Sequence, residues 1–251
     1  MPEQLWLTEL LNRAFAGPVT ALLHALRIPV DHPEAPISNA VAMQLLVVLL
    51  LILVFIMVRS RLSVERPGGL QHMVEGIEGF ITSQSREIIG PHSEAFTGFL
   101  AALGFYILFC NLIGLIPGFE SPTAVPWVPL GCAIVAFFYY HMQGVRRKGA
   151  IHYAMHFLGP ADMPLVMRIV LGALLLPIEI ISHLARVLSL TIRLFANMFA
   201  GDMVTLVFIS LIPIGVPVIF MGLHVFVSVL QTYIFVLLTT VYLQGAVAEE
   251  H

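Results

Sequence analysis

Hydrophobic residues gather in several long runs, separated by short stretches that contain basic residues, proline or glycine. The first run, residues 40–58, holds 19 residues between Asn39 and Arg59. A helix needs about 20 mostly apolar residues to cross the hydrocarbon core of a bilayer. Runs at 95–116 and 127–140 have the same character. The pattern therefore predicts a protein that crosses a membrane several times as helices.

Residues 70–90 follow a different pattern. Charged residues share this segment with apolar residues that recur at helical spacing, namely Met73, Ile77, Phe80, Ile81 and Ile88. One apolar and one polar face predict an amphipathic helix that lies on the membrane surface and does not cross it.

The C-terminal third predicts a hairpin of two long helices over residues 164–247. The first runs to about residue 211 with one internal proline, Pro177, and residues 212–217 interrupt it before the second. A helix of about 45 residues is roughly 70 Å long, more than twice the thickness of the hydrocarbon core. The first helix must therefore tilt strongly, kink at Pro177, or lie across the membrane against another protein.

These elements predict an all-α polytopic membrane protein. It has about five membrane helices plus the amphipathic interfacial helix, and the last two form the long, strongly tilted hairpin. We expect residues 1–38 to lie outside and residues 39–251 to form a single membrane domain. Basic clusters follow the first and third apolar runs, at 59–66 and 146–149. Because basic loops stay in the cytoplasm, the N-terminus is expected outside and the C-terminus inside.

Composition supports the membrane prediction. The chain is 59% hydrophobic and 11% charged, whereas soluble domains are about 25% charged. Its net charge is −3 and no basic stripe is present, which argues against nucleic-acid binding. The mixed first 38 residues do not have the pattern of a cleaved signal peptide.

Polar residues form a stripe along each helix of the predicted hairpin. At 100° per residue, those of the first helix fall within roughly a third of its circumference; they are Glu179, Ser182, His183, Arg186, Ser189, Arg193 and Asn197. The second helix carries His224, Ser228 and Gln231 on one face, with Tyr242 further along. Folding back at 212–217 brings Asp202 and His224 to a similar depth near the outer surface. Polar groups at several depths are what a water-filled or proton-conducting path requires.

Ordinary structural roles also fit several of these residues. Ser and Gln often form hydrogen bonds between membrane helices, and charged residues near the membrane edge extend toward water. Arg193 is the exception, because it stays charged and costs about 2.5–3.5 kcal/mol at the bilayer centre. Glu179 and Asp202 lie too far along the helix for an i,i+4 ion pair. A carboxylate from another protein fits Arg193 better.

Other chemistry has weak support. The chain contains no HExxH, GxSxG or Walker motif, so we expect neither peptide hydrolysis nor nucleotide binding. His152 and His156 lie four residues apart, but no third metal ligand accompanies them. Cys110 and Cys132 are expected to be buried free thiols. We therefore predict no cofactor and no metal.

Several strings carry a family resemblance. LSLTIRLFANMFAGDMV (188–204) and GLHVFVSVLQTYIFVLLTTVYLQGAVAEEH (222–251) hold the pattern RLFxNMxAG and a Gln–aromatic element, while PISN (36–39), FCNLIGLIPG and SPTA lie earlier. Together they closely resemble subunit a of the F-type ATP synthase, the stator of the membrane Fo sector. The resemblance covers nearly all of the chain after residue 36.

The resemblance implies a function for the stripes. In the family, two offset proton half-channels face a ring of c subunits, and an essential arginine separates them, which assigns this role to Arg193. It implies an outer half-channel with Asn197, Asp202, His224 and Gln231, and an inner one with Glu179, Ser182 and His183. Supporting positions are Arg186, Ser189, Ser228 and Tyr242. Whether protons or sodium ions are carried depends largely on the ring, which is another chain.

The resemblance also implies partners and a location. They are the c-ring, the peripheral stalk subunit b, the F1 sector indirectly and membrane lipid, in a bacterial inner membrane. The chain would be part of an enzyme complex without doing ATP chemistry itself. The loop SPTAVPWVPLG lacks the Asp and Asn common in the family, and Val187 replaces a frequent proline, which predicts a more regular helix.

Two other functions remain as alternatives. A secondary transporter would bind an anionic substrate at Arg193, but it needs broken helices or repeated halves, which the sequence lacks. A structural scaffold would tolerate Arg193→Ala without a change in proton flux. Co-purification with a c-ring and a stalk separates the stator from a transporter, which should be complete alone.

Overall fold

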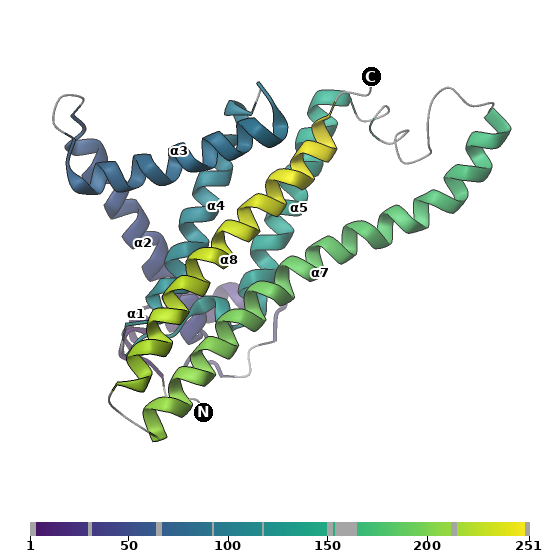
Figure 1. Cartoon of the computed structure of the whole chain (residues 1–251). Coiled ribbons are helices and arrows are strands. Elements are labelled where there is room, and N and C mark those ends of the chain that lie inside the picture. The colour runs from purple at the N-terminus through teal and green to yellow at the C-terminus, as the bar shows by residue number, and fades with distance from the viewer. Residues whose placement is uncertain are drawn as a thin grey trace. The chain divides into compact units, whose positions relative to one another are not determined.

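The computed structural model describes residues 4–29, 32–63, 67–91, 93–116, 118–149, 153, 165–211 and 215–248. Every regular element in these residues is helical (Figure 1). In chain order they are α1 (Trp6–Ala25), α2 (Asn39–Ser60), α3 (Gly69–Ile89), α4 (Glu94–Ile113), the short 3-10 helix η1 (Pro122–Ala124), α5 (Trp127–Lys148), α7 (Leu165–Leu211) and α8 (Val216–Val247). Five of them are long and apolar enough to cross a membrane: α2, α4, α5, α7 from Leu171, and α8. The predicted all-α membrane fold is confirmed.

Local chemistry explains where these helices begin and end. α2 starts after Ser38, whose hydroxyl accepts a hydrogen bond from the Val41 amide at 3.4 Å. α4 ends at Ile113, earlier than the predicted residue 116. α5 is longer than its apolar run and ends in Arg146, Arg147 and Lys148. Basic side chains interact favourably with the negative end of the helix dipole, so the cluster completes the helix.

The N-terminal helix α1 was not foreseen from the sequence. Its apolar residues do recur at helical spacing, a signal that the sequence analysis did not use; they are Trp6, Leu7, Leu10, Leu11, Ala14, Phe15, Val19, Leu22 and Leu23. It docks through Asn12, whose side chain exchanges two hydrogen bonds with the Ile37 backbone, at 3.1 Å to the carbonyl and 3.0 Å from the amide. Asn39 Oδ1 accepts a further hydrogen bond from the Leu5 amide at 3.3 Å. Contacts between residues far apart in sequence therefore position α1.

α7 is one unbroken α-helix of 47 residues that contains Pro177. Proline removes one helical hydrogen bond, but helical geometry continues on both sides, so the chain does not break there. Val187 lies within regular helix, as predicted. Only residues 212–215 separate α7 from α8, which has 32 residues. At 1.5 Å per residue α7 is about 70 Å long.

The chain folds as two compact units, and α4, α7 and α8 each contribute to both. Unit 1 comprises residues 1–72, 105–128 and 195–230, and unit 2 comprises residues 73–104, 129–194 and 231–251. In unit 1, Val47 of α2 packs against Cys110 and Ile113 of α4. Tyr106 donates a hydrogen bond to Gln44 Oε1 at 3.0 Å across the same two helices.

Unit 2 joins its helices through aromatic and close backbone contacts. The rings of Phe99 on α4 and Tyr139 on α5 stack at 3.6 Å between centroids. Gly104 lets α4 approach its neighbours closely, because a Cβ there would lie 3.2 Å from Val236 of α8 and 3.4 Å from Ile81 of α3. These contacts position the C-terminal half of α8 beside α3 and α4.

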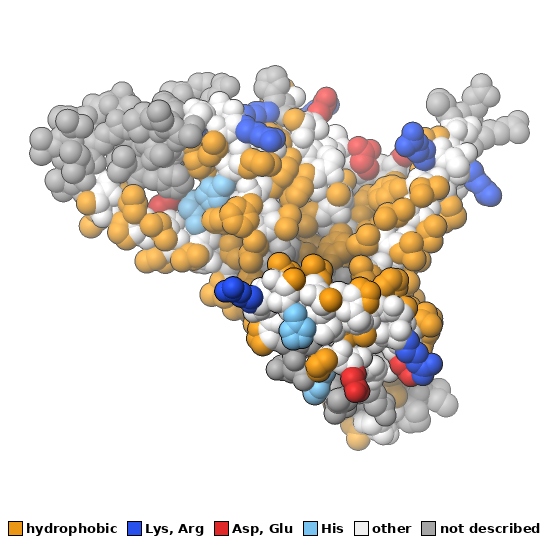
Figure 2. Space-filling model, turned by 180° about the vertical axis from the view of Figure 1, so that it is seen from behind, with side chains coloured by type: hydrophobic (Ala, Val, Ile, Leu, Met, Phe, Trp, Pro, Cys, Tyr) orange, Lys and Arg blue, Asp and Glu red, His pale blue; other side chains and the backbone are white. Residues whose placement is uncertain are grey.

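The exposed surface is largely apolar. Figure 2 shows hydrophobic side chains spread over the visible faces of the helices, with charged groups fewer and scattered. Leu45, Ile52 and Ile56 on α2 are all exposed, as are Leu174 and Ile181 on α7. A soluble protein rarely exposes apolar patches of this kind. The surface is suited to lipid and to other membrane helices.

Candidate functional site

Asp202 of α7 and His224 of α8 meet in unit 1, as the hairpin turn predicts. Asp202 Oδ1 lies 3.7 Å from His224 Nδ1, and the His224 side chain is only 4% exposed. The neighbouring Gly201 makes this approach possible, because a Cβ at that position would lie 2.9 Å from Nδ1 of the imidazole. His224 Nε2 is buried and has no hydrogen-bond partner in the described structure. The pair therefore joins a buried imidazole to a carboxylate that is 24% exposed.

A second polar network in unit 1 binds α4, η1 and α8 together. The Asn111 amide donates to the Ser228 carbonyl at 3.3 Å, and Thr123 donates to Asn111 Oδ1 at 2.6 Å. Ser121 Oγ lies 2.9 Å from Thr123 Oγ1. The Ser228 hydroxyl itself donates to the sulfur of Met198 at 3.7 Å. Ser228 thus lies on the buried face of α8, where its bonds join helices.

A cluster of charged and aromatic groups occupies unit 2. His183 Nε2 lies 3.3 Å from Glu179 Oε1, one turn away on α7. The other ring nitrogen, Nδ1, lies 2.9 Å from the Tyr140 hydroxyl of α5. Arg186 places its guanidinium 4.9 Å from the ring centroid of Tyr242 on α8. The structure therefore brings together four residues of the two predicted stripes, and Ser182 lies half-buried within the same stretch of α7.

α5 and the residues after it add groups that the sequence analysis missed. His141 Nδ1 lies 2.7 Å from the Tyr153 hydroxyl. The His141 and His183 rings are 4.7 Å apart between centroids, and Tyr140 is 2% exposed. The run FFYYH at the C-terminal end of an apolar run, residues 137–141, was the available indication.

Arg193 has few polar partners among the described residues of its own chain. Its guanidinium donates one hydrogen bond to Ser189 Oγ at 3.3 Å. The carboxylates of α7 face elsewhere, Glu179 toward His183 and Asp202 toward His224. In the residues described, Arg193 forms no ion pair. Asn197, one turn further along α7, is exposed, and Gln231 on α8 is fully buried.

Comparison with known proteins identifies the family. The family model for the ATP synthase A chain matches residues 41–244. The chain belongs to the ATP synthase A chain family. A relative from Koribacter versatilis, named ATP synthase subunit a, is 56% identical over 251 residues and the whole of both chains. Proteins of the same name from Solibacter usitatus and Campylobacter curvus are 55% and 41% identical, over 87% and 82% of this chain and 91% and 89% of their own.

The family match covers every candidate residue of the hairpin, from Glu179 to Tyr242. In this A chain family member the candidates form two groups. Asp202 and His224 lie in unit 1, while Glu179, His183, Arg186 and Tyr242 lie in unit 2. Arg193 belongs to the same unbroken helix as Glu179 and Asp202 and lies between them in sequence.

No metal site is apparent in the described part of this A chain. No three His, Cys, Asp or Glu side chains among those residues are grouped so as to hold an ion. His152 and His156 lie outside the described residues. Cys110 and Cys132 are buried free thiols, as predicted.

Proposed function

We propose that this chain is the stator subunit of the membrane Fo sector, the part that couples proton flow to rotation of a c-ring and so to ATP synthesis. Family membership supports this assignment. The proposal includes a single membrane domain over residues 39–251, a bacterial inner membrane, an outside N-terminus and a cytoplasmic C-terminus. The peripheral stalk subunit b binds the same chain, and ATP chemistry occurs in the F1 sector.

The lack of a carboxylate partner for Arg193 in the described structure is the observation that carries the proposal. Its charge has one hydroxyl partner and no carboxylate partner in the described structure. A permanent cation at the bilayer centre costs about 2.5–3.5 kcal/mol. A carboxylate about 4 Å away contributes about 4 kcal/mol at an effective dielectric constant near 20. A ring carboxylate that passes Arg193 therefore offsets the cost, and Arg193 in turn favours its ionisation.

The two polar groups supply the proposed access paths. Asp202, His224, Asn197 and Gln231 form the outer path, and Glu179, Ser182 and His183 form the inner path. Along α7, Arg193 is about 13 Å from Asp202 and about 21 Å from Glu179, from the rise per residue. A proton arrives from outside, neutralises a ring carboxylate, and leaves through the inner path after nearly a full turn.

Arg193 prevents a direct connection between the paths because its charge repels a hydrated proton. Ser189 accepts a hydrogen bond from the guanidinium and holds it in place. Arg186, Tyr242 and Ser228 fix the helices that line the paths. Each charge that crosses releases about 2.3 kcal/mol per 100 mV of membrane potential, and this energy drives rotation.

Two proton measurements on Arg193→Ala test the proposal. The first is ATP-driven pumping in inverted vesicles that carry the whole complex, and the second is passive leak after removal of the F1 sector. We expect lost pumping, an intact complex and an added leak. Arg193→Lys keeps a charge without the planar guanidinium and should recover little pumping. Arg13→Ala on α1 removes an exposed arginine and serves as the matched control. Normal pumping in Arg193→Ala would leave the arginine a structural role.

A further inference from the structure

α5 brings a second histidine to the inner cluster of unit 2. His141 lies beside His183, with ring centroids 4.7 Å apart and planes inclined by 56°. Its Nδ1 is hydrogen-bonded to Tyr153 at 2.7 Å, and its Nε2 is buried without a hydrogen bond in the described structure. We propose that His141 is a further proton-carrying residue, which extends the inner path from His183 through α5 to Tyr153. This inference rests on the proposed function.

The hydrogen bonds of His183 make it a suitable donor. One nitrogen faces the Glu179 carboxylate at 3.3 Å and the other faces the Tyr140 hydroxyl at 2.9 Å. An imidazole held at both nitrogens can take a proton on one side and release it on the other. The adjacent His141 ring, 4.7 Å away between centroids, is the next titratable group on α5.

Tyr153 gives the His141 proton a defined neighbour. Burial, and next the charge of Glu179, raise the pKa of Tyr153. The hydroxyl is therefore protonated at neutral pH and can both accept and donate. The Tyr153 ring packs against α5 at Gly144. A Cβ at Gly144 would collide with this ring and lie 3.1 Å from the Ala246 carbonyl. The missing side chain leaves room for the ring whose hydroxyl meets His141.

The proposed transfer conserves protons. In the tautomer whose Nδ1–H donates to Tyr153, the Nε2 lone pair of His141 accepts a proton from His183. The Nδ1 proton then moves to the Tyr153 oxygen while the hydroxyl proton leaves to water. One proton enters, one leaves and the ring returns to neutral; exchange with water restores the first tautomer.

The groups around His141 disfavour a lasting positive charge on its ring, so a proton that binds there is passed on. The charged and titratable groups around it are Tyr140 on its own helix, His183, Arg186 and Glu179 on α7, Tyr242 on α8, and Tyr153. The permanent charge of Arg186 disfavours a second lasting cation nearby. Protonation at the buried Nε2 also creates a charged N–H that has no acceptor in the described structure, which is costly, so the proton does not stay there.

Passive proton conduction through the assembled Fo sector tests the inference. Vesicles that carry the complex are stripped of F1, a potassium gradient with valinomycin sets the voltage, and a pH-sensitive dye reports flux. We expect His141→Gln and His141→Ala to lower the flux at least tenfold, because a positioned proton-transferring side chain contributes about 10²–10⁴-fold. Tyr153→Phe, which removes only the hydroxyl, should lower it less. His72→Gln, an exposed histidine on α3, is the matched control.

Rescue distinguishes proton transfer from a packing role. Imidazole added on the cytoplasmic side should restore flux in His141→Ala and leave the control unchanged. Unchanged flux in His141→Gln, or a loss in His141→Ala that imidazole does not restore, would overturn the inference. Arg193→Ala is measured in parallel. If it loses pumping while His141→Gln conducts normally, the inference fails and the proposed function stands; if it pumps normally, the proposed function itself fails.

Discussion

Gly201 is the residue whose missing side chain matters most to the contact between Asp202 and His224. A Cβ at this position would lie 2.9 Å from two atoms of the His224 ring. Gly201→Ala should therefore displace the imidazole from Asp202, although alanine favours the helix itself by about 1 kcal/mol. We expect a clear loss of ATP-driven pumping with normal amounts of the chain in the membrane. Gly222→Ala on α8, where a Cβ meets nothing within 4 Å, is the control. Equal pumping in the two variants would contradict a role for the close contact.

Individual contacts differ in how far the sequence predicts them. The pairing of Asp202 and His224 was predictable, because a turn at 212–217 fixes which positions of two antiparallel helices are level. The contact of His141 with Tyr153 was not, since helical periodicity describes one helix and does not place α5 beside α7. Asn111 gave an indication, as an amide within an apolar run. Its partners Thr123 and Ser228 depended on tertiary packing.

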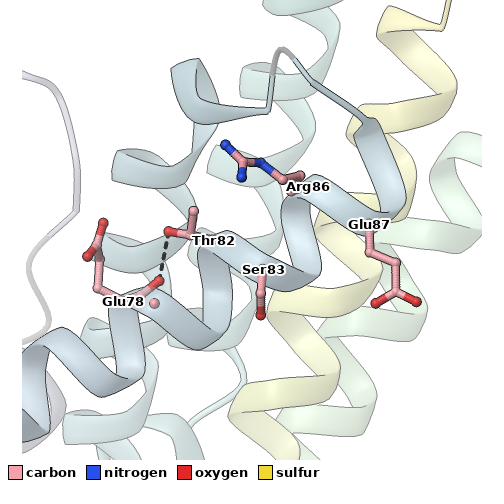
Figure 3. Close-up of a pocket in the computed structure, with 6 residues that line it drawn as sticks. Glu78, Thr82, Ser83, Arg86 and Glu87 are labelled. Atoms are coloured by element: carbon pink, nitrogen blue, oxygen red, sulfur yellow. Dashed lines mark hydrogen bonds between the residues drawn. The ribbon is translucent and has the colours of Figure 1, made fainter.

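At the scale of elements, α3 presents a polar surface for which labelling makes a direct prediction. A shallow groove of about 600 Å³ runs along this one helix, lined by Glu78, Gly79, Thr82, Ser83, Arg86 and Glu87 (Figure 3). Ser83 is exposed there, whereas Ser85, two residues on, is 1% exposed. In inverted vesicles, a membrane-impermeant maleimide should label Ser83→Cys quickly and Ser85→Cys slowly. Right-side-out vesicles should protect both. Fast labelling from outside would contradict the proposed orientation.

The docking of α1 gives a second prediction about an element. Asn12 makes two hydrogen bonds to the Ile37 backbone, both buried. Asn12→Ala leaves these backbone groups unsatisfied, which costs about 1–3 kcal/mol each at most sites. We expect faster proteolysis of α1 and a lower unfolding temperature of the detergent-solubilised complex. Arg13→Ala, which removes only an exposed ion pair with Glu9, should change neither.

The elements also show where pattern analysis succeeds. Long apolar runs predicted α2, α4, α7 and α8 well, because burial in lipid demands about 20 consecutive apolar residues. α1 was missed because it has no such run and is held by hydrogen bonds from Asn12 and Asn39. α5 extends beyond its apolar run because the basic residues at its end support the last turn.

At the scale of the whole molecule, the proposed function requires a partner along α7. Several side chains on one side of Arg193 are short and exposed, namely Ala185, Ser189, Ala196 and Ala200. Small residues let membrane helices approach closely. The sequence predicted that Arg193 pairs with a carboxylate from another protein. A helix face with small side chains is where such a protein can approach closely. Neither the partner's identity nor its position follows from helical periodicity, because both depend on another chain.

A bulky substitution on this face tests the arrangement. Ala196→Trp places a large ring about 60° around the helix from Arg193, by the helical angle, and should keep the c-ring away. We expect ATP-driven pumping to fall about tenfold or more, since positioning of reacting groups contributes several kcal/mol, while the chain remains in the membrane. Leu184→Trp, also exposed but about 180° from Arg193, should pump normally because its ring faces away from the partner. If Ala196→Trp pumps as well as Leu184→Trp, the c-ring does not pass this face of α7. The carboxylate that stabilises Arg193 must then come from another direction.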